Sequence, residues 1–374
     1  TILLIVFFLF KEAGGLFNTP ATEEGYVLAV NKSNDVGKLS PEMIMDIFDG
    51  NITNWKDISG MDQDILIFRF SDLTNYYTEE ELGDEFQYVP QKISELVAKE
   101  PGIIAFFPKQ YLLENGFQGK VLPEEKITLG EFFGGTKWYP TSTPAPIFGL
   151  IPLLLGTLLV SIGAIILSLP FGIAVAIYMA EIANKRTRGL LKPIIELLAG
   201  IPSVVYGFFG LAVIVPLIQK TFDLPVGETA FAGSVVLAIM ALPTIITVAE
   251  DAMRTTPRAM KEASLALGAT QWQTIYKVII PYSISGITSA VVLGIGRAIG
   301  ETMAVLMVTG NAAVIPTSFF EPVRTIPATI AAELGEAPAG GAHYEALFLL
   351  GAVLFLITLI LSISVEYISS KRKI

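Results

Sequence analysis

The chain has 374 residues with a formal net charge of −10, and 52% of its residues are hydrophobic. This apolar fraction, with a mean hydropathy of +0.60, exceeds the ~45–50% usual for soluble domains and favours a membrane protein. The negative charge argues against nucleic acid as a partner. Because cysteine is absent, the sequence gives no indication of the redox compartment.

The acidic charge belongs to one part of the chain. Residues 11–149 contain 11 Lys and Arg against 22 Asp and Glu, a net charge of −11, while the remainder has a net charge of +1. Residues 1–10 are apolar but too few to cross a hydrocarbon core, which requires about 20 residues. We therefore interpret residues 1–16 as the end of a truncated first transmembrane helix and residues 17–140 as a separate lobe.

The lobe has the pattern of a small α/β domain. Short apolar runs at 27–30, 65–68 and 102–107 predict buried strands, and residues 40–48 and 91–98 predict helices. Ser40 is the expected cap of the first helix, with Pro41 in its first turn. Three prolines mark the exit linker: Pro140, Pro144 and Pro146.

Part of this lobe resembles one half of the periplasmic phosphate-binding proteins. The run LSxExxxDIFxGxIxNW, from Leu39 to Trp55, and the later EPGIIAFFPKQYL carry the resemblance. That family has Arg-Ser-Asp-x-Ser-Gly-Thr around its anion, where this chain has RFSDLTN from Arg69, so the glycine is missing. Arg69 and Ser71 are the candidate anion contacts. A lobe that only docks a partner or supports the structure is the favoured interpretation, and a working anion site is the alternative.

Five later runs are free of charged residues and long enough to span a membrane: 147–180, 197–219, 229–249, 278–296 and 346–365. With the first helix, they predict about six spans. Basic residues gather in three places on one side: Lys185, Arg186, Arg188 and Lys192; Arg254, Arg258 and Lys261; Lys371, Arg372 and Lys373. The positive-inside rule makes that side cytoplasmic and places the lobe outside, in a multi-pass protein of the plasma (inner) membrane.

A polar segment, residues 256–281, interrupts the apolar runs. Thr256 and Pro257 are suited to begin a helix, Gly268 is suited to end it in a left-handed cap, and a second short helix is expected from Gln271 to Pro281. The spacing of Glu262-Ala263-Ser264, Gly268 and Pro281 resembles the EAA loop of ABC-transporter permeases, with conservative replacements at three positions. The resemblance implies that these five residues contact a separate ATPase subunit.

One span contains two ionisable residues, Arg297 and Glu301, in the run GRAIGETMAV. At i and i+4 they are expected to share a helix face. Charge at membrane depth is costly and usually faces a bundle interior or a substrate path. The run resembles the PstC-type permease subunit of phosphate-specific transport (Pst) systems, a MetI-like permease fold. There the Arg and Glu are implicated in phosphate translocation, which implies substrate-path roles for Arg297 and Glu301.

Together these patterns predict a permease core over residues 141–374 and an extracytoplasmic α/β lobe. The resemblance implies the membrane subunit of an ATP-driven phosphate importer with alternating access. From the charges, our hypothesis is that Glu301 neutralises Arg297 until phosphate arrives. The chain has no G-x-x-x-x-G-K-[ST] loop, so ATP and Mg²⁺ are expected on a partner, and we expect no enzyme activity, bound cofactor or metal site.

The implied partners are a PstA-like permease subunit, two ATP-binding subunits, a phosphate-binding protein, phosphate itself and membrane lipid. Two other functions stay open. The chain could be a permease for another oxyanion, such as molybdate or sulfate, which substrate competition would decide. It could also be a phosphate-sensing scaffold for a signalling partner, although the complete EAA spacing favours transport.

Overall fold

The computed structural model describes residues 2–370, and the predicted basic residues Lys371, Arg372 and Lys373 lie outside this range. The described chain divides into two compact units. Within the described residues, the first unit is helical and comprises residues 2–13, Leu150–Ala339 and 346–370, and the second is the α/β lobe, Gly14–Gly149 with Gly340–Glu345.

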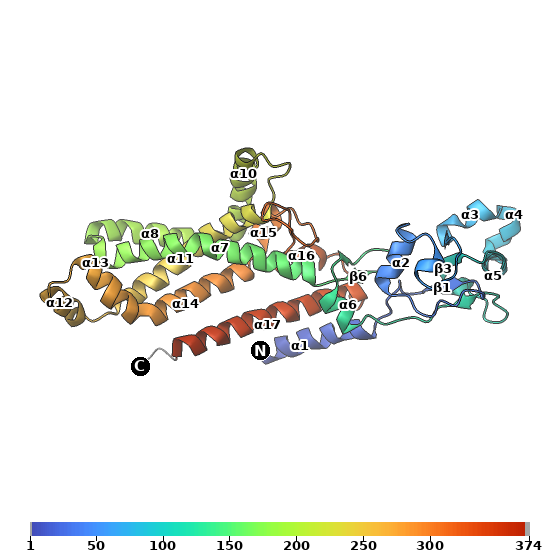
Figure 1. Ribbon diagram of the computed structural model, residues 1–374, viewed down its shortest axis with the longest axis horizontal. Helices are drawn as coiled ribbons and strands as arrows, with labels where there is room; N and C mark the ends of the chain where they lie inside the picture. Colours follow the sequence, from blue (N-terminus) through green and yellow to red (C-terminus); the bar gives the residue numbers. More distant parts are fainter. Residues whose placement is uncertain (1, 371–374) are drawn as a thin grey trace. The chain divides into compact units, whose positions relative to one another are not determined.

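The lobe is built on a four-stranded sheet in the order β2-β3-β1-β4. Its two central strands, β3 and β1, are labelled in Figure 1. Its strands are β1 (Tyr26–Val30), β2 (Leu66–Arg69), β3 (Ile103–Pro108) and β4 (Lys120–Val121). β3 pairs in parallel with β2, Ile103 opposite Leu66, and antiparallel with β1, Phe107 opposite Val27. The three strands expected from the sequence are confirmed, and β4 is an addition.

Both faces of the sheet are buried, which explains why its central strands are continuously apolar. Alternate residues of β1 and β3 pack into two cores, one that includes Ile93 of α5 (Val89–Lys99) and one that includes Ile47 of α2 (Pro41–Phe48). Ser40 caps α2 as expected, since its hydroxyl accepts the Met43 N–H at 3.3 Å. The lobe therefore has three layers, with the sheet between helices.

The remaining elements of the lobe are short. They are η1 (Leu16–Asn18), η2 (Trp55–Asp57), η3 (Phe70–Asp72), α3 (Leu73–Tyr76), α4 (Glu79–Leu82), η4 (Asp84–Phe86), η5 (Lys109–Tyr111), α6 (Leu129–Gly134), β5 (Trp138–Tyr139) and β6 (Ile147–Phe148). β5 and β6 pair antiparallel, and the segment expected as an exit linker thus forms a hairpin with buried Trp138 and Phe148.

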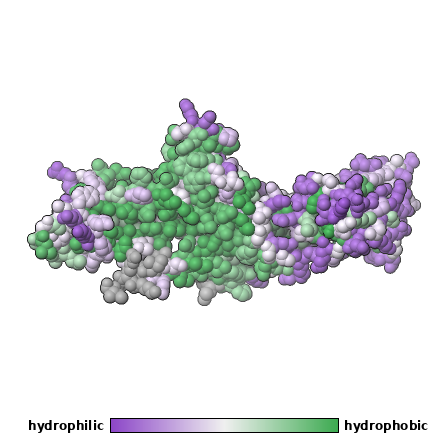
Figure 2. All heavy atoms as spheres, in the orientation of Figure 1, coloured by the Kyte–Doolittle hydropathy of each residue, from purple (hydrophilic) through white to green (hydrophobic). Residues whose placement is uncertain are grey.

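The helical unit contains five helical segments long and apolar enough to cross a membrane, counted among the described residues. They are Ile151–Ile182, Ser203–Phe222, Ala230–Arg254, Gln271–Ile299 and Ala342–Ser364, and they coincide with the five apolar runs of the sequence. A further apolar helix, α1 (Ile2–Gly15), occupies the predicted end of the first span. Hydrophobic residues cover this unit in Figure 2, whereas the lobe surface is largely hydrophilic.

The spans are assembled from α7 (Ile151–Ile177), η6 (Tyr178–Ile182), α9 (Ser203–Phe209), η7 (Gly210–Ile214), α10 (Val215–Phe222), α11 (Ala230–Arg254), α13 (Gln271–Thr274), η8 (Ile275–Ile279), α14 (Ile280–Ile299) and α17 (Ala342–Ser370). The shorter helices α8 (Lys185–Gly200), α12 (Arg258–Ala266), α15 (Met303–Val308) and α16 (Ile326–Glu333) connect them. The segments η6, η7 and η8 are single turns of π-helix that continue the α-helices beside them.

α11 is the central helix of this unit and packs against both α7 and α14. Ile245 of α11 lies against a glycine of each neighbour: a Cβ at Gly172 would lie 2.7 Å, and one at Gly294 2.9 Å, from its side chain. Small residues allow helices to approach closely in a membrane, where van der Waals packing holds them together. The close approach at Gly294 is therefore a contact between helices.

Candidate functional site

The loop between the third and fourth of these spans is a pair of short helices. α12 is followed by Gly268, which has a φ of +84° with nothing within 4 Å of where a Cβ would lie. The left-handed end predicted from the sequence is confirmed, and it requires glycine for backbone reasons alone. Thr270 then begins α13 with a capping box. Its hydroxyl accepts the Gln273 backbone N–H, and its own backbone N–H donates to the Gln273 side-chain oxygen.

Two details of this loop differ from the prediction. Thr256 does not cap α12; its hydroxyl lies 3.2 Å from that of Ser283, and both are buried. The second helix does not stop at Pro281 but continues through η8 into α14, because proline is tolerated in the first turn of a helical segment. The loop therefore joins the fourth span without a break.

The loop is attached to the end of α7. Lys261 forms an ion pair and hydrogen bond with Glu181 of η6, and the Gln271 side chain donates to the Glu181 carbonyl at 3.0 Å. Within the loop, the hydroxyls of Ser264 and Thr274 lie 3.0 Å apart. The loop is thus joined to two spans, the first through Glu181 and the fourth through η8. Glu181 was not singled out from the sequence, where its only signal is a carboxylate just after an uncharged run.

The outer surface of the loop is available to another protein. No residue of α12 is buried, and Glu262 and Ala263 are exposed. The same segment carries three large exposed apolar side chains: Leu267 is 89% exposed, Trp272 65% and Tyr276 73%. Exposed apolar residues grouped in this way mark interaction surfaces. Sequence reasoning missed the three, although each lies within the segment it identified.

Arg297 and Glu301 do not share a continuous helix face, so that expectation is wrong. α14 ends at Ile299, and residues 300–302 separate it from α15, so the two side chains lie on opposite sides of a helix end. The Arg297 guanidinium donates to the Thr244 hydroxyl of α11 at 3.3 Å, whereas the Glu301 carboxylate accepts the Ala304 N–H at 3.3 Å. Arg297 is half-buried, and the described residues contain no ion pair between it and a carboxylate.

A buried carboxylate at the loop end of α11 was also missed. Glu250 is 1% exposed and is surrounded by Arg188 at 2.7 Å, Arg254 at 3.6 Å and Lys192 at 3.8 Å. These contacts hold α8 against α11. The two basic groups predicted for one side of the membrane, residues 185–192 and 254–261, therefore meet at one end of the helical unit.

In the lobe, the predicted anion contacts Arg69 and Ser71 form hydrogen bonds with neighbouring residues. The Arg69 guanidinium donates to the Phe48 carbonyl at 2.8 Å and lies over the Phe48 ring. The Arg69 backbone N–H donates to the Asp72 carboxylate at 3.1 Å. The Ser71 hydroxyl lies 3.5 Å from the same carboxylate. A carboxylate thus lies where an oxyanion would need a donor. Trp55, from the signature run, is fully buried and donates to the Gly102 carbonyl, so this run maintains the fold.

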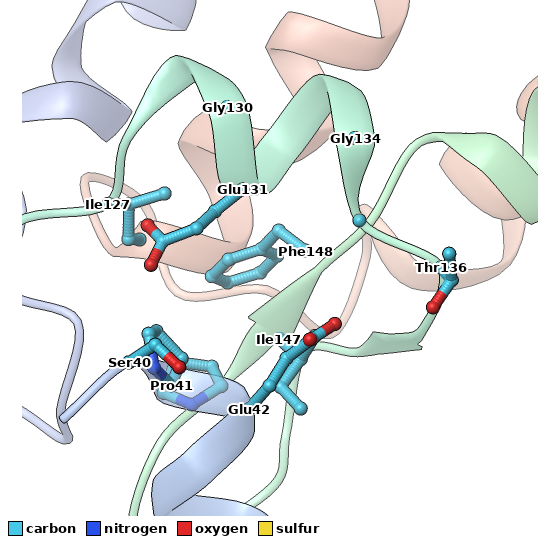
Figure 3. Close-up of a pocket in the computed structure, with 12 residues that line it drawn as sticks. Ser40, Pro41, Glu42, Ile127, Gly130, Glu131, Gly134, Thr136, Ile147 and Phe148 are labelled. Carbon is cyan, nitrogen blue, oxygen red and sulfur yellow. The ribbon is translucent and has the colours of Figure 1, made fainter.

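A separate pocket of about 270 Å³ lies between α2, α6 and β6 (Figure 3). Glu42 and Glu131 supply carboxylates to its wall, and Ile147 and Phe148 supply apolar surface. Glu131 also caps α6 through the Thr128 N–H and hydroxyl. Carboxylates repel an anion at neutral pH, so this pocket is unsuited to phosphate.

Spanning-length helices with an exposed helical loop between two of them define the helical unit as a multi-pass membrane component that docks another protein. Residues 168–374 match the sequence model described as a binding-protein-dependent transport system inner membrane component, and residues 8–148 match that of a PBP superfamily domain. The chain belongs to the former family. It is a permease of the ABC-transporter type, a transport component and not an enzyme, and permeases of this type work with an ATPase.

Curated relatives match mainly in this permease region. The chain is 42% identical over 244 residues to the probable ABC transporter permease protein YqgH of Bacillus subtilis, covering 65% of this chain and 79% of that protein. It is 39% identical over 253 residues to the phosphate transport system permease protein PstC of Pasteurella multocida, covering 62% and 78%. Among solved structures, an inward-facing MetNI methionine ABC transporter aligns at 18% identity with a TM-score of 0.48, covering 60% of this chain and 96% of that one.

Proposed function

We propose that the chain is the membrane subunit of an ATP-driven importer of inorganic phosphate. The observation that carries the proposal is Arg297, a permanent positive charge within the fourth span whose hydrogen bond goes to the neutral hydroxyl of Thr244. A half-buried cation that is not ion-paired to a carboxylate offers compensation to an anion that crosses the membrane. The PstC name of several relatives at 34–39% identity supports phosphate as that anion.

Glu301 has a different role in this proposal from the one expected. Because it accepts the Ala304 N–H at the start of α15, it fixes the break after α14 and leaves the Arg297 guanidinium unneutralised. The break at residues 300–302 follows the end of the fourth span at Ile299, and in the broken helices of transporters irregular backbone of this kind lines a cavity. Arg297 and this break together form the proposed phosphate path.

Energy is supplied through the EAA loop. Import against an inside-negative potential costs ~2.3 kcal/mol per charge per 100 mV, so a passive path would leak phosphate outward. In the proposal, one of the transporter's two ATPase subunits docks at the exposed face around Glu262, Ala263 and Trp272 and moves the spans through Lys261 and Glu181. The proposed orientation has this loop in the cytoplasm and the lobe outside, next to a phosphate-binding protein, with a second, PstA-like permease subunit completing the pore.

The test is labelled phosphate uptake in phosphate-starved cells that lack their own permease subunit. The cells receive this chain with its partners as wild type, Arg297→Gln, or Lys220→Gln as a control that removes one exposed charge from α10. Uptake that depends on ATP, resists molybdate and sulfate, and disappears only in Arg297→Gln supports the proposal. Uptake retained by Arg297→Gln makes that arginine structural, and no phosphate uptake by an assembled wild type favours another oxyanion or a sensing role.

A further inference from the structure

A basic cleft lies at the loop end of the helical unit, on the face that carries α12. Its volume is about 490 Å³, and its walls come from η6, the first half of α8, the end of α11 and the start of α12. Six basic residues line it: Lys185, Arg188, Lys192, Arg254, Arg258 and Lys261. Figure 2 shows hydrophilic residues gathered at this end of an otherwise apolar unit.

The positive charge of the basic cleft exceeds the negative charge around it. Among the described residues, three carboxylates form ion pairs with its cations, namely Glu250, Asp251 and Glu181. Lys185 and Arg258 take part in none of these pairs, and both are exposed. Three positive charges therefore remain uncompensated in one concave site. Positive-inside topology accounts for basic residues on one side of a membrane, but it does not require them to line a common cavity.

Two helix ends add to this excess. α8 and α12 both begin at the basic cleft, and neither has an acidic residue in its first turn. Lys185 and Arg258 instead occupy the first helical positions, although a helix N-terminus carries about half a positive charge and favours anions. α12 also lacks a capping side chain; the Met260 N–H donates to the Pro257 carbonyl at 3.1 Å, which leaves the N–H groups of the first two positions for another acceptor. A bound anion would relieve both conflicts.

We propose that the basic cleft binds a phosphate group. Phosphate offers several strong acceptor oxygens and up to two negative charges, which match guanidinium, ammonium and helix N-terminal N–H donors. The volume admits a phosphate carried on a larger group, so either free inorganic phosphate or the headgroup of an anionic lipid supplies the same chemistry. Because Arg258 and Lys261 belong to α12 and Lys185 to α8, an occupant links the EAA loop to α8 whatever the transported substrate is.

The experiment measures binding to the full chain in nanodiscs of neutral lipid. The chain carries Arg297→Gln throughout, so that the proposed transport path does not contribute to phosphate binding. One arm titrates labelled inorganic phosphate, and the other measures retention of labelled phosphatidylglycerol against labelled phosphatidylcholine. The test variant is Lys185→Gln with Arg258→Gln. The matched control is Arg186→Gln with Lys277→Gln, which removes two exposed charges from the same two regions outside the cleft.

The expected result is a loss of affinity of about tenfold or more in the test variant and little change in the control, since only the former loses charge-assisted contacts to the anion. Binding in the phosphate arm identifies free phosphate as the source, and binding in the lipid arm identifies a headgroup. The proposal is overturned by equal losses in both variants or by no binding in either arm. It is also overturned if only an acidic segment of a partner protein occupies the cleft.

Discussion

The ion pair between Lys261 and Glu181 is predicted to carry force from the EAA loop to the spans. It joins α12, which displays the exposed docking face, to η6 at the end of the first long span. The Gln271 bond goes to the main-chain carbonyl of Glu181 and therefore survives a side-chain change at that position. Lys261→Ala and Glu181→Ala each remove the ion pair and leave this second attachment in place.

The expected magnitude follows from the burial of the pair. The Lys261 and Glu181 side chains are 23% and 11% exposed, so the pair is neither fully solvated nor fully buried. Exposed pairs contribute about 0–1 kcal/mol, and hydrogen bonds to charged groups about 1.5–3 kcal/mol. A coupling free energy of about 1–2 kcal/mol is therefore expected, which corresponds to a factor of about 5–30 between attached and detached loop states.

The assay is transport by the complete transporter reconstituted in vesicles, with substrate uptake and ATP hydrolysis measured together. Each single variant is expected to lower the substrate moved per ATP hydrolysed, and the double variant to resemble either single one, because the second change removes nothing further. The charge-reversed pair Lys261→Glu with Glu181→Lys is expected to restore part of the loss. Lys277→Ala, an exposed lysine of η8, is the control. Unchanged stoichiometry in both single variants, or effects that add in the double variant, would refute the reasoning.

Three further predictions concern single sites. Gly268→Ala, at a φ of +84°, is expected to destabilise the loop by ~1–2 kcal/mol and to lower coupled transport, without a steric clash; normal ATP-coupled uptake would contradict this. Glu250→Gln leaves Arg188 without its buried carboxylate and is expected to cost ~1–3 kcal/mol, measured as a lower thermal midpoint of the purified chain. In the lobe, hydrogen bonds from Thr78 hold the pKa of Glu81 below its usual range, so their stabilisation is present at neutral pH and is lost as the pH falls through that lowered pKa. An NMR titration should show this pKa rising in part in Thr78→Ala, which removes the hydroxyl bond and keeps the larger contribution of the Thr78 backbone N–H; an unchanged value would exclude the hydroxyl as a cause.

The lobe illustrates how a resemblance in sequence can indicate a fold without its binding site. The run from Leu39 to Trp55 correctly predicted α2 and its cap, because capping and burial of Trp55 depend on neighbouring residues and one sheet. The anion contacts depended on where Arg69 and Asp72 point after folding. The Phe48 carbonyl accepts from one Nη of the Arg69 guanidinium, and the Asp72 carboxylate accepts the Arg69 backbone N–H, so both groups are engaged within the lobe.

Sequence alone determined the five spans, the lobe's three main strands and the left-handed end at Gly268. These features follow from hydropathy and backbone preferences, which act over a few residues and survive any tertiary arrangement. Only the tertiary structure decided which charges meet. Arg297 donates a hydrogen bond to Thr244 of another helix, and Lys261 pairs with Glu181 eighty residues away. The basic residues of α8, α11 and α12 line one cleft. Such pairings depend on helices distant in sequence, so no local pattern specifies them.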